Sequence, residues 1–132
     1  SAIDLLPIAP KDAPRIILFL AEGENHEIGL LLAHFIAKQL GWRVFYLGQN
    51  VPHDNVKTMA DLVKPNYLLT FFVTTTPSVV EEKVFKLSSE AKTPLLFSGS
   101  PINFEPNDNN MVTYLESPTD LIKVLETELP LV

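Results

Sequence analysis

The chain contains no cysteine, which excludes disulfide bonds and metal sites built on thiolates. It also lacks a run of roughly 20 apolar residues, the length that a membrane-spanning helix needs. Its first residues have neither the basic start nor the apolar stretch of a signal peptide. We therefore expect a cytoplasmic protein without a membrane segment.

Positive charge is scarce as well. The 10 Lys and Arg residues are outnumbered by 16 Asp and Glu, which gives a formal net charge of −6. The basic residues are scattered and form no stripe, so the chain as a whole should repel a phosphate backbone. If the full protein acts on DNA, another segment must hold the DNA.

The length and composition fit one domain with a real core, since the chain has 132 residues and 46% of them are hydrophobic. Residues 1–14 hold three prolines, which favour extended backbone. We interpret 1–14 as a linker or the truncated end of an upstream domain, and 15–132 as the domain itself.

From residue 15 onward, short apolar runs alternate with segments that have helical spacing. Strands are expected at 15–21, 43–48, 67–73, 94–100 and 111–115, and helices at 27–41, 53–65, 78–92 and 117–129. Such alternation predicts an α/β fold with a parallel, doubly wound sheet and helices on both faces. Five strands in this rhythm suit the flavodoxin-like strand order 2-1-3-4-5.

In such a sheet the ligand site lies beyond the carboxyl ends of the strands. Here those ends lead into loops 22–27, 74–77 and 98–110. The first loop contains Glu24 and His26 and opens a helix that carries Gly29. A neutral imidazole at this place can bind a metal through one nitrogen, while its other nitrogen needs an acceptor such as Glu24.

Residue types alone leave a plainer interpretation open. His26 could be a solvated loop histidine, and the acidic residues could simply favour a helix N-terminus by their charge. The remaining conspicuous side chains are interpreted as packing or helix-start residues: His34, Trp42, His53, Phe71 and Phe72.

The segment 24–29, Glu-Asn-His-Glu-Ile-Gly, resembles the Asp-x-His-x-x-Gly signature of cobalamin-binding domains. The Glu24 variant, with the following Tyr46-Leu47-Gly48 and Val51-Pro52, is similar to the branch found in MerR-type transcriptional regulators. The resemblance implies that His26 is the lower ligand of cobalt, that Glu24 hydrogen-bonds His26, and that Gly29 makes room for the cofactor. Its specific part spans 22–56.

Two further motifs of that family are matched in part. A Ser/Thr-rich turn that meets the nucleotide tail of the cofactor corresponds here to Thr74, Thr75 and Thr76, although the family's Leu is missing. A Gly-Gly pair that lets the tail pass corresponds to Ser98-Gly99, with one glycine. The alternatives are a Ser/Thr cap for the helix at 78–92 and a simple strand-to-loop turn at Gly99.

The resemblance implies a sensory module of a transcriptional regulator rather than an enzyme. Cobalamin would be its cofactor, and binding would alter packing against upstream helical and DNA-binding domains of the same protein, with a homo-oligomer left open.

A corrinoid carrier of a methyltransferase or mutase, and a scaffold that has lost the cofactor, stay as alternatives. A phosphoacceptor receiver domain fits poorly, because it needs an Asp at the end of the third strand, where Val73-Thr74 stand. A flavodoxin-type flavin site fits poorly as well, because the acidic first loop has the wrong charge for phosphate.

Overall fold

The computed structural model describes residues 2–6, 9–104 and 111–129. Its centre is a five-stranded parallel sheet in the order β2-β1-β3-β4-β5, which confirms the predicted fold class and strand order. The strands are β1 (Arg15–Ala21), β2 (Arg43–Val51), β3 (Tyr67–Phe72), β4 (Leu95–Gly99) and β5 (Val112–Tyr114).

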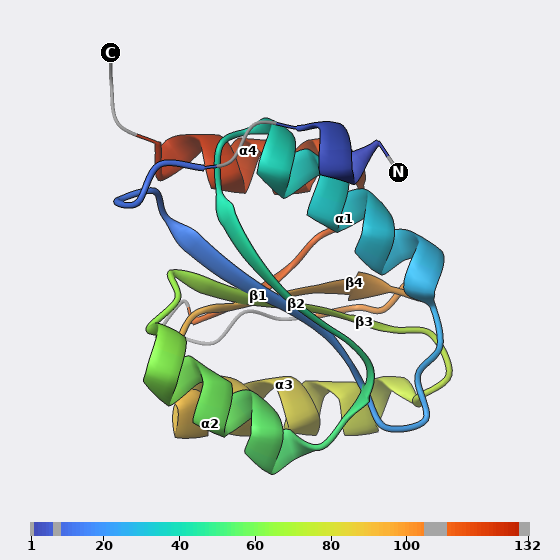
Figure 1. Cartoon of the computed structure of the whole chain (residues 1–132). Coiled ribbons are helices and arrows are strands. Elements are labelled where there is room, and N and C mark those ends of the chain that lie inside the picture. Colours follow the sequence, from blue (N-terminus) through green and yellow to red (C-terminus); the bar gives the residue numbers. More distant parts are fainter. Residues whose placement is uncertain (1, 7–8, 105–110, 130–132) are drawn as a thin grey trace.

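Helices cover both faces of the sheet (Figure 1). They are α1 (Glu27–Gln39), α2 (His53–Val63), α3 (Pro77–Ala91) and α4 (Pro118–Thr127). The helices α1 and α4 lie on one face, and α2 and α3 lie on the other. Because successive side chains of a strand point to opposite faces, Phe71 packs beside the α1–α4 core and Phe72 beside the α2–α3 core.

The central strand β1 shows why the sheet needs two covering layers. Its five inner residues, 16–20, are all buried, so both of its faces are excluded from water. A continuous apolar run of this kind is typical of a parallel strand with helices on either side.

The edge strand β2 differs from its prediction. It continues to Val51 rather than stopping near residue 48, and its pairing with β1 shifts register after Leu18 and again after Phe19. Gly48 and Asn50 adopt left-handed backbone conformations in this irregular stretch. A half-exposed edge strand tolerates polar residues and bulges, which explains why the apolar pattern ended too early.

The helix ends agree with the sequence to within two residues. Gly41 follows the last turn of α1 with a φ of +90°, the role expected of a glycine just beyond a helix. Ser117 is the N-cap of α4 and Pro118 its first residue, but the Ser117 side chain makes no capping hydrogen bond.

The N-terminal stretch contains a 3-10 helix at Ile3–Leu5, and Ala13 is buried. Parts of the predicted organisation lie outside the described residues, namely 1 and 7–8 of the segment 1–14, 105–110 of the polar loop, and 130–132 at the C-terminal end. Across the described ranges, no helix is both long and apolar enough to cross a membrane.

Candidate functional site

The loop that follows β1 and the loop that follows β3 lie side by side at one edge of the sheet (Figure 1). Glu24 joins them. Its side chain is 1% exposed, and its carboxylate accepts hydrogen bonds from the backbone N–H groups of residues 73–75 at 2.9 to 3.2 Å. The hydroxyl of Thr75 also donates to Glu24 Oε1 at 2.7 Å. A buried carboxylate with several donors is well satisfied and holds its loop in place.

These contacts decide the charge state of Glu24. Burial raises the pKa of its carboxyl, but hydrogen bonds from Val73, Thr75 and Thr74 lower it by more, so the pKa lies below its ordinary value. Glu24 is therefore ionised at neutral pH, and the negative charge is balanced by N–H dipoles rather than by a cation.

His26 lies two residues further on and has a different environment. Its side chain is exposed, and its ring lies 5.7 Å from the ring of Phe71, measured between centroids. Within the described part of the chain, the His26 ring makes no hydrogen bond. The expected bond from Glu24 to His26 is absent, because both carboxylate oxygens of Glu24 point to the loop at 73–75.

Gly29 provides the surface on which the His26 ring rests. A Cβ at position 29 would lie 2.7 Å from His26 Cδ2, 2.9 Å from His26 Nε2 and 3.1 Å from Phe71 Cε2. The absence of a side chain therefore lets the imidazole lie against the first turn of α1. The prediction that Gly29 makes room for a cofactor stays a prediction, because the His26 ring lies in that space in the structure.

A cavity of about 200 Å³ opens beside His26, between the sheet and the helices α1 and α4. We call it the His26 pocket. It is lined by His26, Gly29, Leu32, Ala33, Ile36, Leu69, Phe71, Ser98, Leu115, Glu116, Ser117, Pro118 and Leu121. His26 also borders a second, more open hollow, with Phe71, Val73, Ser98, Gly99 and Ser100. The imidazole thus borders two hollows.

Sequence reasoning missed the part played by Phe71 and by the start of α4. Phe71 was interpreted as core, yet it is only partly buried and lines both hollows. The alternation of the strand assigns Phe71 and Phe72 to opposite faces, which is the signal that could have separated them. Nothing local to 116–118 indicates that these residues line the same pocket as His26, since their position depends on how α4 packs.

The three threonines do not act as one group. Thr74 and Thr75 direct their hydroxyls to Gly23 O and to Glu24, and Thr76 makes no side-chain cap at the start of α3. The capping interpretation is therefore wrong for all three. None of the threonines lines the His26 pocket, so the structure separates them from Ser98 and Gly29, which do.

Ser98 and Gly99 both have structural roles. The Ser98 hydroxyl donates to the carbonyl of Leu115 at 2.6 Å, which ties β4 to the segment before α4. Gly99 has a φ of +130°, and a Cβ there would lie 2.1 Å from the carbonyl oxygen of Phe72. Its glycine therefore serves a close strand-to-strand approach as well as the turn.

The other conspicuous side chains have structural surroundings. Trp42 is fully buried and its Nε1 donates to the carbonyl of Leu125, while the His34 ring stacks on Tyr46 at 5.0 Å. Burial and the nearby Lys38 lower the pKa of His34, against an opposing effect of Asp4. Within the described ranges no three His, Asp or Glu side chains gather as a metal cluster, so the metal prediction rests on His26 alone.

The fold matches solved cobalamin-binding proteins. A cobalamin-binding protein from Desulfitobacterium hafniense superposes with a TM-score of 0.69 at 23% identity, over 89% of this chain and 59% of that one. The methanol:cobalamin methyltransferase complex MtaBC of Methanosarcina barkeri gives 0.74 at 24% identity, over 90% and 47%. The monomethylamine corrinoid protein of the same organism gives 0.71 at 26% identity, over 89% and 59%. The class of fold is that of the cobalamin-binding domains.

The sequence is also similar to that of a transcriptional repressor. The HTH-type transcriptional repressor CarA of Myxococcus xanthus is 36% identical over 70 residues, which are 53% of this chain and 24% of the repressor. No family model matches the chain. The resemblance of the sequence to the cobalamin-binding domain of a MerR-type regulator is thereby confirmed. The chain spans about a quarter of the repressor and about half of the solved chains.

Proposed function

We propose that this domain binds cobalamin, with His26 as the lower ligand of cobalt, and serves as the sensory module of a transcriptional regulator. The observation that carries the proposal is the position of His26. An exposed imidazole borders two hollows at the carboxyl edge of a doubly wound sheet, the usual place for a ligand in this fold.

The residues around His26 fit a large, partly apolar ligand. Ile28 is 81% exposed and Leu32 is 47% exposed, one helical turn apart on α1, and Val73, which borders the more open hollow, is 39% exposed. The His26 pocket offers a separate, mostly apolar recess for a narrower part of the ligand, bordered by Ser98 and Ser117. A corrin ring on the outer surface and a nucleotide tail in the recess would use both features.

Cobalamin, when bound, supplies a cobalt ion that accepts an imidazole nitrogen as its lower ligand. His26 must present a neutral nitrogen for this role, and its exposed ring has no hydrogen bond to any described residue that would have to break. Glu24 acts at one remove: it fixes the loop from which His26 projects. For a ring N–H of His26 to donate to Glu24, the carboxylate would have to release one of its present donors or accept a further hydrogen bond.

The proposed role of the module is regulation without catalysis. The similarity to the transcriptional repressor CarA supports a protein in which a separate segment holds DNA, and the charge of −6 agrees with that division. Cofactor binding would shift the packing of upstream helical and DNA-binding domains, and the module itself would carry no reaction. The proposal leaves open whether the regulator forms a homo-oligomer.

A corrinoid carrier of a methyltransferase is the second candidate. It is favoured by the fold similarity to the methyltransferase complex and to the monomethylamine corrinoid protein. The two candidates share the cobalt site and differ in what is fused or bound to the domain. A DNA shift that depends on cobalamin and the full-length protein supports the regulator, whereas methyl transfer from bound methylcobalamin to a thiol supports the carrier.

The central test is a titration of the purified domain with hydroxo-, methyl- and adenosylcobalamin, followed by gel filtration and visible spectra. We expect at least one form to co-elute and its spectrum to change in the way that imidazole ligation produces. His26→Ala should abolish the spectral change, while the control His53→Ala, on the opposite face, should keep it. If no form is retained, the proposal fails and the domain is a scaffold. Retention with an unchanged His26→Ala spectrum would remove His26 from the cobalt.

A further inference from the structure

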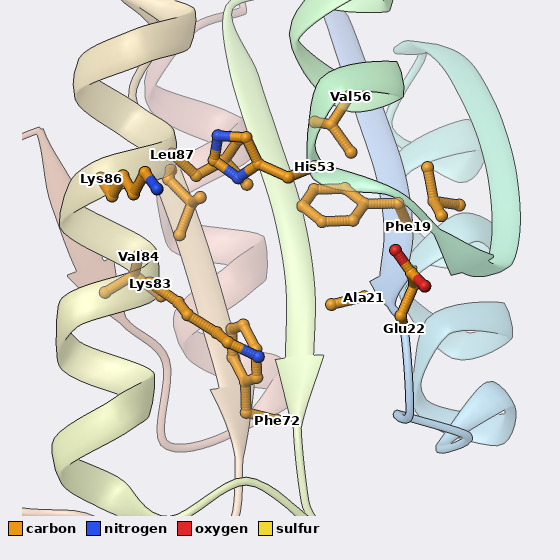
Figure 2. A pocket seen from close by; sticks show the side chains of 12 residues that line it. Phe19, Ala21, Glu22, His53, Val56, Phe72, Lys83, Val84, Lys86 and Leu87 are labelled. Atoms are coloured by element: carbon orange, nitrogen blue, oxygen red, sulfur yellow. The ribbon is translucent and has the colours of Figure 1, made fainter.

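A second cavity lies on the other face of the sheet. It measures about 270 Å³ and opens between α2 and α3, over strands β1 and β3. We call it the α2–α3 slot. Figure 2 shows it from close by: Phe19 and Glu22 stand on one side, Val84 and Leu87 of α3 on the other, and His53 between them. No residue of the proposed cobalamin site lines it.

The floor of the slot is apolar and well buried. It consists of Phe19, Val51, Val56, Phe72, Val84, Leu87 and Leu95, all at most 9% exposed. An apolar cavity of about 150 Å³ suffices to bind benzene, and drug-sized ligands occupy roughly 300 Å³ or more. The slot therefore suits one small apolar group, such as an aromatic ring or a branched alkyl chain.

The rim of the slot carries charges of both signs. Lys83 and Lys86 project from α3 three residues apart, hence from one side of the helix, and His53 begins α2. His53 is bonded to Glu90, and the pKa of Glu90 is lowered by that hydrogen bond first and by the charge of Lys86 among others. His53 and Lys86 therefore already interact with the carboxylate of Glu90.

Two further charged residues, Lys83 and Glu22, line the slot. Lys83 extends from α3 toward Phe72, and Glu22 follows β1 on the opposite wall (Figure 2). Among the residues that the structure describes, neither side chain makes an ion pair or hydrogen bond. One unpaired cation and one unpaired anion therefore face a single apolar recess from opposite walls. A ligand complementary to this arrangement has an apolar body and a head that carries both charges.

We propose that the α2–α3 slot binds a small α-amino acid with an apolar side chain. The side chain enters the recess above Phe19 and Phe72, the carboxylate pairs with Lys83, and the ammonium pairs with Glu22. Such a site would give the domain a second input that reaches strand β3 from the face opposite His26, since Phe72 lines the slot and Phe71 lines the His26 pocket.

The test uses L-phenylalanine as the probe, followed through amide shifts of the isotopically labelled domain by NMR. We expect saturable shifts at Phe19, Val56 and Val84 in the millimolar range. Hydrocinnamate lacks the amine and phenethylamine lacks the carboxylate, and each should bind at least fivefold more weakly than the amino acid. Lys83→Gln should weaken binding of phenylalanine and hydrocinnamate, and Glu22→Gln should weaken binding of phenylalanine and phenethylamine.

The controls separate the slot from the rest of the surface. Glu81→Gln changes an exposed charge on α3 that does not line the slot and should leave every affinity unchanged. His26→Ala should do the same, so a failed cobalamin titration would leave this result intact. The proposal is overturned if phenylalanine gives no saturable shifts, if the shifts gather at the His26 pocket, or if hydrocinnamate binds as well as the amino acid and Glu22→Gln has no effect.

Discussion

Two groups of residues meet at the carboxyl edge of the sheet, and they differ in how firmly they are held. Glu24 and Ser98 are bound to the fold by partly buried hydrogen bonds, and Gly99 by a backbone contact that admits no side chain. The His26 ring lies against Gly29 and Phe71 and makes no hydrogen bond with any described residue. The difference teaches that Glu24, Ser98 and Gly99 hold the loops of this edge together, while the His26 side chain stays exposed beside them.

The largest loss of stability is expected at Gly99, where the backbone leaves no room for a side chain. Gly99→Ala places a Cβ 2.1 Å from the carbonyl oxygen of Phe72 at a φ of +130°. We expect a loss of about 4 kcal/mol in the free energy of unfolding, from backbone strain and overpacking together. Urea unfolding followed by far-UV circular dichroism measures it. A loss below about 1 kcal/mol would show that β3 and β4 can separate at this point.

Glu24→Gln should have the next largest effect. It removes the charge and turns an amide N–H₂ toward backbone donors, which should cost about 2 to 3 kcal/mol at pH 7. Since the folded-state pKa of Glu24 lies below its ordinary value, the ionised group stabilises the fold above that ordinary value. This stabilisation is lost as the pH falls through the folded-state pKa.

The difference in unfolding free energy between the parent and Glu24→Gln should therefore shrink as the pH is lowered from 7 into the acid range. Urea unfolding at a series of pH values measures the trend. The matched control is Glu81→Gln, at an exposed position on α3, which should leave the parent profile unchanged. A difference that stays constant with pH would mean that Glu24 is not the titrating group.

Gly29→Ala should have a smaller effect, because the obstacle is the end of an exposed side chain. The new Cβ would displace the His26 ring, while alanine improves the helix by about 1 kcal/mol over glycine. We expect the unfolding free energy to change by less than about 1 kcal/mol. The two-dimensional NMR signals of the His26 ring should shift as it leaves Phe71. Unshifted ring signals would contradict the packing described here.

His26→Ala should change stability least, by under about 0.5 kcal/mol, because the ring is exposed and makes no hydrogen bond with any described residue. This is the sharpest form of the comparison, since Glu24 stands two positions away and should cost several times as much. Thermal unfolding of both variants measures the contrast. Equal losses at positions 24 and 26 would mean that the histidine is as much a part of the fold as the glutamate.

The sequence predicts the element order and the sheet topology well, because buried strands and helices have strong apolar patterns of their own. The run at 15–21 and the helix that begins at Glu27 are matched to the residue at those ends. The end of β2 was not predictable in this way, since Gln49 and Asn50 are exposed and polar on an edge strand. The polar residues there reflect exposure to solvent, and they do not reveal that the strand continues to pair with β1.

The site is predicted less completely, and the reason is distance along the chain. The motif identifies Glu24 and His26 as special residues. The partner of Glu24, however, is a loop about 50 residues away, and whether its carboxylate turns to that loop or to the histidine depends on how close β1 and β3 bring the two turns. The contribution of 116–118 depends likewise on the packing of α4, which no local pattern encodes.

The single tryptophan gives the domain a built-in optical reporter. The indole of Trp42 is fully buried, bonded to the carbonyl of Leu125 in α4 and close to the ring of Tyr67, and it lines neither the His26 pocket nor the α2–α3 slot. Its emission should therefore change colour when α4 detaches from the sheet. Because the indole lines neither cavity, its wavelength maximum can monitor folding while amide or visible signals monitor ligands on the same sample.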